Sequence, residues 1–465
     1  MNKPTLDLKP GEARCPGRSV QDILDSDGDN PPSHYRLDGY RYLGSEDIPF
    51  DRYTSADFFQ QELDRMWPRV WQWACREEHI PEVGDYYVYD VGPYSFIVVR
   101  TAPDTVKAYY NACLHRGTKL KASGPGGSSA DITCPYHGWR WTLDGKLDRL
   151  LCDWDFPHVD VEEFNLPEVQ VGLWGGFVFI NMDENAPPLE EYLAPLPEHA
   201  LRARLEDRYI SLHIEKILPC NWKAAQEAFL EAYHVPETHP QLLRSSGGVN
   251  TQYDLLGPHL SRLYSPSASP GPMLDFPITE QQILEATTIG KTKNVDGFQV
   301  PEGSTARKAL AEHFRKLLME RAGWDVSEYS VAEITDTVSY CAFPNGTFFL
   351  SISFPVVMRF RPLGMDHTKC VYDLILMSPV PKDGPRPEPY EAVRIGIEDS
   401  YTKVPGMDSY MGHVFDQDTM NMGRQQEGFM AAKKKTATLA NYQEVRIRHT
   451  HQILDRYLAE PGEQG

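Results

Sequence analysis

Two short segments decide the fold of this chain: "NACLHRGTKL" at residues 111–120 and "ITCPYHGWRW" at residues 132–141. They carry two thiols and two imidazoles in the patterns C-x-H and C-x2-H, namely Cys113, His115, Cys134 and His137. One interpretation is a structural zinc site with two Cys and two His ligands. The other is a [2Fe-2S] cluster in which one iron takes both thiolates and the other takes both imidazoles. The cluster is favoured, because it requires each segment to pair one Cys with one His.

Glycines directly follow both ligand pairs, at Gly117 and Gly138. Glycine allows the backbone to approach closely, so that N–H groups can hydrogen-bond the cluster sulfurs. Imidazoles in place of two thiolates also lower the negative charge and raise the reduction potential. The sequence therefore predicts a [2Fe-2S] cluster that accepts electrons readily.

A second metal motif lies in "NWKAAQEAFLEAYHVPETH" at residues 221–239. Helical spacing places three side chains on one face: Glu227, Glu231 and His234. Pro236 is expected to end the helix, so that the following loop can return His239 to the same point. Two imidazoles and one carboxylate form the facial triad of non-heme Fe(II) oxygenases. The alternative is an amphipathic helix with an incidental His pair.

Together these motifs resemble those of a known family. "CLHRG" and "CPYHGW" are similar to the Rieske iron-sulfur signature, and the third segment resembles the iron-binding motif of Rieske non-heme iron oxygenases, alpha subunit, the aromatic-ring-hydroxylating dioxygenase family. The likeness runs from about residue 46 to the C-terminal region. It implies an α+β fold with an antiparallel β Rieske domain. The catalytic domain would have a curved antiparallel sheet and helices, of the helix-grip or START-like type.

The resemblance also implies the remaining site residues. Asp418 matches the third iron ligand of the family, because Gln426 and Gly428 follow it at the family's offsets. Asp416 is the alternative ligand. Glu231 matches a carboxylate that links the iron site to a cluster-ligating His of the neighbouring subunit. Many members carry Asp there, which leaves the branch of the family open.

The function implied is hydroxylation of an apolar, aromatic small molecule at a mononuclear Fe(II), using O2 and electrons relayed from NAD(P)H. A ferredoxin or flavin reductase would donate the electrons, and the family's assembly is a homotrimer, with or without a beta subunit. One alternative is a monooxygenase or demethylase acting on an N-methyl, O-methyl or quaternary ammonium substrate, for which aromatic rings could form a cation cage. A different class is a non-catalytic electron carrier or zinc-stabilised binding module, which would have no use for the His234 and His239 motif.

The pattern along the chain divides it into three parts. Residues 1–45 are rich in Pro, Gly and Asp and predict an arm that depends on the rest for order. Short alternating runs predict an antiparallel Rieske domain over 46–170, with "GLWGGFVFINM" as a further strand beyond it. Strands and helices then predict a catalytic domain over 171–465, in which residues 244–308 are irregular.

Composition limits the partners of the chain. A net charge of -20 over 465 residues disfavours nucleic acid and anionic membranes. Eight Cys without a dense framework indicate reduced thiols, and the first residues lack an apolar signal segment, so a cytoplasmic protein is expected. Three cations near the cluster are either a docking face for an acidic electron donor or ordinary surface residues: Arg116, Lys119 and Lys121. Three further imidazoles are expected to be ordinary histidines: His213, His259 and His413.

Overall fold

The computed structural model describes residues 8–289, 298–353 and 355–459. The chain forms two compact units. The first comprises Met1–Phe59, Leu193–Phe360 and His367–Gly465, and the second comprises Gln60–Tyr192 and Arg361–Asp366. The second unit is therefore an insertion into the first. Helices and antiparallel sheets occur in both, which confirms the predicted α+β class.

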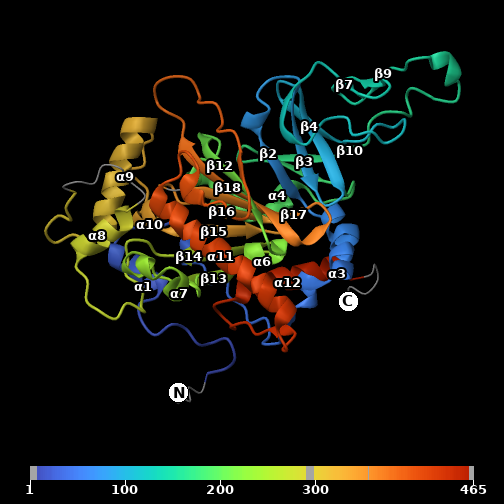
Figure 1. Cartoon of the computed structure of the whole chain (residues 1–465). Coiled ribbons are helices and arrows are strands. Elements are labelled where there is room, and N and C mark those ends of the chain that lie inside the picture. The colour runs from blue at the N-terminus through green and yellow to red at the C-terminus, as the bar shows by residue number, and fades with distance from the viewer. Residues whose placement is uncertain (1–7, 290–297, 354, 460–465) are drawn as a thin grey trace. The chain divides into compact units, whose positions relative to one another are not determined.

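The inserted unit is built on a seven-stranded antiparallel sheet (Figure 1). In spatial order its strands are β2 (Gln72–Arg76), β11 (Phe177–Asn181), β10 (Glu168–Trp174), β5 (Thr105–Tyr110), β4 (Tyr94–Ala102), β3 (Asp85–Val91) and β6 (Gly124–Ser128). A three-stranded sheet is formed by β7 (Ile132–Thr133), β8 (Arg140–Trp141) and β9 (Leu147–Arg149). The alternating segments over 85–110 therefore form the expected strands.

The end of this unit lies beyond the boundary expected at residue 170. "GLWGGFVFINM" is a hairpin rather than one strand, because Gly175 and Gly176 both adopt positive φ and turn the chain between β10 and β11. Strand β10 pairs with β5 and β11 pairs with β2, so both belong to the seven-stranded sheet. The unit accordingly continues to Tyr192.

The larger unit contains an eight-stranded sheet that is antiparallel except for the pairing of β12 with β19. In spatial order its strands are β13 (Gln252–Leu255), β14 (Leu260–Ser265), β15 (Thr337–Ala342), β16 (Gly346–Phe349), β17 (Val356–Leu363), β18 (Asp366–Pro379), β12 (Arg208–Leu218) and β19 (Val393–Ile395). Strands β1 (Ile48–Pro49) and β20 (Thr436–Ala437) form a separate pair. Residues 244–308, expected to be irregular, contain the strands β13 and β14 and a helix over Glu280–Thr288.

The larger unit also contains most of the helices of the chain. They are α1 (Val20–Asp27), α2 (Asp51–Thr54), α3 (Ala56–Gln61), α5 (Leu196–His199), α6 (Trp222–Glu227), α7 (Val235–Thr238), α8 (Glu280–Thr288), α9 (Ala306–Ala322), α10 (Val331–Thr335), α11 (Ser409–Ala431) and α12 (Val445–Leu458), while α4 is Leu189–Leu193. The long helix α11 crosses the sheet and contacts β12 and α6, and α12 contacts β13 and β14 (Figure 1). No described helix is long and apolar enough to cross a membrane.

The N-terminal segment joins the larger unit through buried polar contacts. Arg307 on α9 pairs with Asp27 at 2.6 Å and with Asp336 at 2.5 Å. The backbone N–H of Gly39 donates to Asp254 at 2.7 Å. Residues 8–45 of the expected arm are therefore held by the catalytic part of the chain, and residues 1–7 lie outside the described residues.

Candidate functional site

The two Cys-His segments form matching tight turns in the inserted unit. The N–H of Gly117 donates to the carbonyl of Cys113 at 2.8 Å, and the N–H of Gly138 donates to that of Cys134 at 3.1 Å. Both glycines adopt left-handed backbone, with φ of 75° and 69°. A residue with a Cβ is strained in that conformation, so glycine allows each turn to close directly behind its ligand pair.

The two turns bring the two thiols together and the two imidazoles together. The thiols of Cys113 and Cys134 are close enough to hydrogen-bond each other, and the rings of His115 and His137 lie 4.7 Å apart. Nδ1 of His115 is buried and has no hydrogen-bond partner among the described residues. Two thiols on one side and two imidazoles on the other fit a cluster with thiolates on one iron and imidazoles on the second. The orphaned imidazole nitrogen fits a metal bond in place of a hydrogen bond.

Backbone donors surround the sulfurs. Burial opposes ionisation of the Cys134 thiol, but the N–H groups of Tyr136 and His137 donate to its sulfur and lower its pKa. Burial raises the pKa of Cys113, although the N–H groups of His115 and Arg116 donate to it as well. N–H groups directed at both sulfurs support the thiolate form, which is the metal ligand.

The cations near these turns have different environments. Nη2 of Arg116 lies 3.2 Å from Nε2 of His137, and its guanidinium lies over the exposed ring of Tyr136. Lys119 is paired with Asp90 at 3.0 Å, and Lys121 lies over the ring of Tyr86. Of the three, only Arg116 faces the ligand set, so the ordinary surface interpretation fits the two lysines.

The second cluster of potential ligands lies in the larger unit. One ligand atom each from His234, His239 and Asp418 lie within 4.8 Å of one another. Nε2 of His239 lies 2.7 Å from Oδ1 of Asp418, and Nε2 of His234 lies 3.6 Å from the same oxygen. Two imidazoles and one carboxylate converging on one point fit a facial triad, so the donor set suits a mononuclear Fe(II).

Local structure at this cluster differs from the expected single helix. Helix α6 ends at Glu227, and the chain passes through turns before α7 begins at Val235. Pro236 lies in the first turn of α7, where its missing N–H costs nothing, rather than ending a preceding helix. Glu227 therefore does not share a face with Glu231, and instead binds Tyr53 and His451. His234 and His239 flank α7 at its two ends.

The structure separates the two candidate carboxylates on α11. Asp418 is 6% exposed and faces both imidazoles. Asp416 instead accepts hydrogen bonds from the Ser400 hydroxyl and the Tyr401 N–H. Gln426, further along the helix, accepts from the N–H of Asn221 at 2.9 Å. Because Asn221 is the N-cap of α6, this bond fastens α11 to the start of the His-bearing segment.

Each imidazole of the triad is oriented by a second side chain. Glu231 lies 2.7 Å from Nδ1 of His234 and also accepts its backbone N–H. Oε1 of Gln417 lies 2.9 Å from Nδ1 of His239 and accepts from Gln241 at 2.7 Å. Partners of this kind fix the ring orientation of ligating histidines. Gln417 was missed in the sequence, where its only signal is its place beside Asp418.

A cavity of about 240 Å³ opens onto the triad. Its lining is mainly apolar and includes four aromatic rings, those of Phe229, Phe349, Tyr410 and Phe415. Small hydroxyl residues form much of the remainder. A concave, largely apolar cavity with polar groups at defined places is the usual form of a small-molecule site.

Another cluster of possible ligands, His213, Glu215 and Asp373, is occupied by protein cations. Arg359 donates to both oxygens of Asp373, at 3.0 Å each, and Arg394 pairs with Glu215. His213 lies 3.1 Å from Asp373 and is an ordinary buried histidine, as expected.

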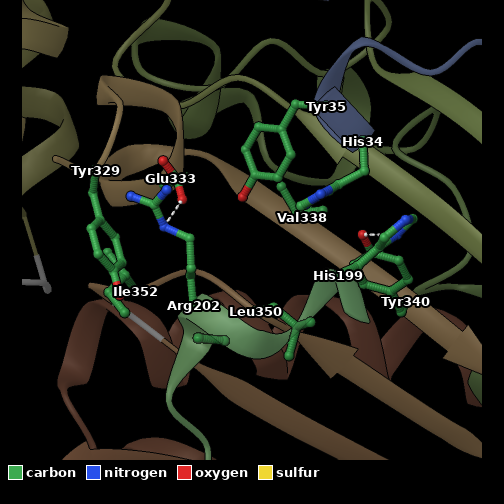
Figure 2. A pocket seen from close by; sticks show the side chains of 11 residues that line it. His34, Tyr35, His199, Arg202, Tyr329, Glu333, Val338, Tyr340, Leu350 and Ile352 are labelled. Atoms are coloured by element: carbon green, nitrogen blue, oxygen red, sulfur yellow. Dashed lines mark hydrogen bonds and ion pairs between the residues drawn. The ribbon is translucent and has the colours of Figure 1, made fainter. Parts of the chain in front are cut away.

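A small polar cavity lies where the N-terminal segment meets the sheet (Figure 2). His34 stacks on His199 there with ring centroids 4.3 Å apart, and Arg202 pairs with Glu333. Its volume of about 20 Å³ holds roughly one water molecule. This cavity is therefore too small for a substrate.

Two family models match this chain. Residues 70–153 match the family model of the Rieske [2Fe-2S] domain. Residues 201–460 match that of the ring hydroxylating alpha subunit (catalytic domain), which covers more than half of the chain.

Curated relatives are similar over part of their length. The carnitine monooxygenase oxygenase subunit of Escherichia coli (strain K12) is 32% identical over 195 residues, 42% of this chain and 52% of that protein. The glycine betaine monooxygenase oxygenase subunit of Pseudomonas aeruginosa (strain UCBPP-PA14) is 30% identical over 199 residues, 43% and 46% of the two chains. Benzene 1,2-dioxygenase subunit alpha of Pseudomonas putida is 33% identical over 192 residues, 40% and 42%. These alignments span about half of the relatives' length.

Solved structures share the fold. The quaternary ammonium Rieske monooxygenase CntA with L-carnitine gives a TM-score of 0.61 at 17% identity, over 90% of this chain and 97% of the other. Naphthalene 1,2-dioxygenase with indole bound in the active site gives 0.61 at 17% identity, over 90% and 93%.

Proposed function

Because the chain belongs to the family of ring-hydroxylating alpha subunits, we propose that it is a Rieske-type oxygenase that hydroxylates an apolar, aromatic small molecule. The observation that carries the proposal is the convergence of His234, His239 and Asp418 at a mostly apolar cavity of about 240 Å³. A chain that only carried electrons would have no use for such a cavity. The inserted unit supplies the second donor set on the same chain.

Named residues would hold the two cofactors of the family. Cys113, His115, Cys134 and His137 would bind the [2Fe-2S] cluster, and His234, His239 and Asp418 would bind the mononuclear iron. When bound, these centres supply single electrons and allow dioxygen to react with a closed-shell organic molecule. The assignment of all seven ligands is part of the proposal.

The chain's own side chains would position the reactants. Glu231 holds the Nδ1 proton of His234, and Gln417 holds that of His239, so that Nε2 of each ring faces the third ligand. Phe415 and Val414 on α11 line the cavity and would exclude water from the bound substrate. The residues that line the cavity would decide which carbon of the substrate faces the iron site.

Partners belong to the proposal as well. A ferredoxin or flavin reductase would donate electrons near Arg116, whose guanidinium faces His137. In a homotrimer, with or without a beta subunit, Glu231 would connect the iron site to a cluster-ligating His of the neighbouring subunit. The eight cysteines form no disulfide in the described chain, which fits a reducing compartment such as the cytoplasm.

A second candidate is a monooxygenase that demethylates a quaternary ammonium compound. Similarity to the carnitine and glycine betaine monooxygenase oxygenase subunits favours it. The four aromatic rings of the cavity could surround such a cation.

A single turnover tests the proposal and separates the candidates. Chemically reduced protein is mixed with isotopically labelled O2 and a panel of aromatic hydrocarbons, aromatic ketones and N-methylated amines, and the products are identified by mass spectrometry. Two labelled atoms in one ring product indicate a dioxygenase, and one atom indicates a monooxygenase. Formaldehyde with a demethylated amine supports the second candidate. If the reduced protein incorporates no label from any member of the panel, the oxygenase proposal fails.

A further inference from the structure

The charges around the reaction cavity are confined to the metal side. Among the described residues that line it, the only carboxylates are Glu231 and Asp418, and both are engaged by imidazoles. No lysine or arginine is among these lining residues. A buried carboxylate without a cation, or a buried ammonium without a free carboxylate, carries a desolvation cost of several kcal/mol by order of magnitude. The cavity therefore favours an uncharged ligand.

Hydroxyl side chains gather at one end of three neighbouring strands. Strand β14 ends at Ser265, β15 begins at Thr337 directly opposite it, and Ser351 follows the end of β16. The loops beyond these strand ends add Ser267 and Ser353. We call the five residues the hydroxyl cluster: Ser265, Ser267, Thr337, Ser351 and Ser353. Because β14, β15 and β16 are antiparallel neighbours, these strand ends lie side by side at the same end of the sheet.

The hydroxyl cluster has unused hydrogen-bonding capacity. Oγ of Ser267 lies 3.4 Å from Oγ1 of Thr337, and Oγ of Ser351 lies 3.1 Å from Oγ of Ser353. One hydrogen bond within such a pair uses one donor and leaves a second donor and several lone pairs. Ser265 is 6% exposed and lines the same cavity. Polar groups at buried positions ordinarily have a partner, so a ligand or water is expected here.

We propose that the hydroxyl cluster binds a hydroxyl or carbonyl oxygen of an uncharged substrate, while the hydrocarbon part fills the cavity beside Phe415 and Val414. The substrate class is thus an oxygen-bearing hydrocarbon, such as a cyclic ketone or alcohol, rather than a carboxylate or a quaternary ammonium ion. This inference rests on the proposed oxygenase function, because it names what that same cavity selects.

Equilibrium binding to the purified holoenzyme tests the inference without turnover. The probes are 1-indanone and indane, which share a carbon skeleton and differ in one carbonyl oxygen, and their affinities are measured by titration calorimetry. The wild type is expected to bind the ketone about fivefold more tightly than the hydrocarbon, the ratio that one net hydrogen bond provides. Indane-1-carboxylate is expected to bind more weakly than either probe.

Variants assign the preference to the hydroxyl cluster. Thr337→Val combined with Ser351→Ala removes two hydroxyls at nearly constant shape and is expected to abolish the ketone preference while indane affinity is kept. The single variant Ser351→Ala, which disturbs packing less, should reduce the ketone preference. The matched control is Ser339→Ala with Thr347→Val, which makes the same chemical changes in the same sheet at buried positions that do not themselves line the cavity, and it should keep the ketone preference.

Several results would overturn the inference. Equal affinity of the wild type for both probes would mean that the hydroxyls hold only water. Binding of neither probe would also contradict the inference. So would an unchanged ketone preference in both hydroxyl variants, or loss of that preference in the control. Failure of the proposed function looks different, since ketone preference would persist while the single turnover incorporates no labelled oxygen.

Discussion

The two regions proposed to bind metal are built in opposite ways. The proposed cluster ligands of the inserted unit lie in two tight turns, within 25 positions of one another, and the neighbouring Tyr136 ring is 62% exposed. The triad of the larger unit joins residues that are up to 184 positions apart, and the side chains of His239 and Asp418 are only 3% and 6% exposed.

This difference matches two tasks. A centre that receives electrons from another protein must lie near the surface, because electron transfer depends on close approach. A centre where oxygen meets substrate must be shielded, because water competes with the reactants and weakens electrostatic interactions. The comparison predicts that damage to the two regions can be separated experimentally.

Loss of a triad ligand should have the largest effect. Asp418→Ala is expected to lower turnover to below about 1% of wild type, because loss of a supporting residue alone costs 10- to 100-fold. Iron analysis should show loss of the mononuclear iron, while the visible spectrum of the cluster stays intact. The matched control on α11 is Asp416→Asn, which should keep both the mononuclear iron and turnover. Loss of the cluster spectrum in Asp418→Ala would contradict independent sites.

Loss of a cluster ligand should have the reverse signature. Cys113→Ser is expected to remove the visible absorption of the cluster and NAD(P)H-driven turnover, since a serine hydroxyl is a poor iron-sulfur ligand. Mononuclear iron should remain bound. Cys152→Ser, at an exposed free thiol of the same unit, should change neither quantity. Loss of the mononuclear iron together with the cluster in Cys113→Ser would contradict separate sites.

Removal of the Glu231 charge should have an intermediate effect. Glu231→Gln is expected to lower turnover by about 10- to 100-fold, because the amide no longer stabilises the orientation and basicity of His234 as a carboxylate does. Steady-state rates and iron content measure the loss of turnover. Glu237→Gln on α7 is the control and should leave turnover unchanged. Unchanged turnover in Glu231→Gln would remove its role in positioning and electron transfer.

Acid sensitivity should give the smallest effect. Burial, then the charges of His199, Arg262 and Arg202, lowers the pKa of His34 to about 3. Burial and the charge of Arg262 lower the pKa of His199 to about 4 (Figure 2). The unfolded chain takes up protons below about pH 6.5 while these folded rings stay neutral, so the free energy of unfolding falls as pH drops from 6.5 towards 4.

A stacking-compatible substitution measures that contribution. His34→Phe should recover about 1 to 2 kcal/mol of the stability lost between pH 7.5 and pH 5 in urea denaturation. His413→Gln, on the exposed face of α11, should behave as wild type. Equal acid sensitivity of His34→Phe and wild type would show that the His34 ring is protonated in the folded chain.

How far the sequence predicted these regions depends on how local each one is. Cys113, His115, Cys134 and His137 form two short motifs whose spacing alone indicates the ligand division. The family resemblance drawn from them is confirmed by the matching family models. The choice of Asp418 needed the resemblance, since no spacing rule connects α11 to residues 179 and 184 positions earlier.

The backbone conformation around the second motif could not be predicted from the sequence. Helical spacing over 221–234 predicted one long helix, but α6 ends at Glu227, whose carboxylate binds Tyr53 and His451 in distant parts of the chain. Likewise the hydroxyl cluster joins the ends of three strands, and nothing local to Ser265 or Ser351 indicates that they meet. Such juxtapositions depend on strand order, which a single sequence does not state.

The pairing of β1 with β20 has a consequence for the order in which this chain can fold during synthesis. The side chain of Asp47 binds Thr436, 389 positions later, on either side of the inserted unit. On a ribosome, the inserted unit can complete most of its contacts as soon as residue 192 has emerged. The N-terminal strand must wait for almost the whole remaining chain, so a nascent chain would expose its unfinished larger unit long after the inserted unit is formed.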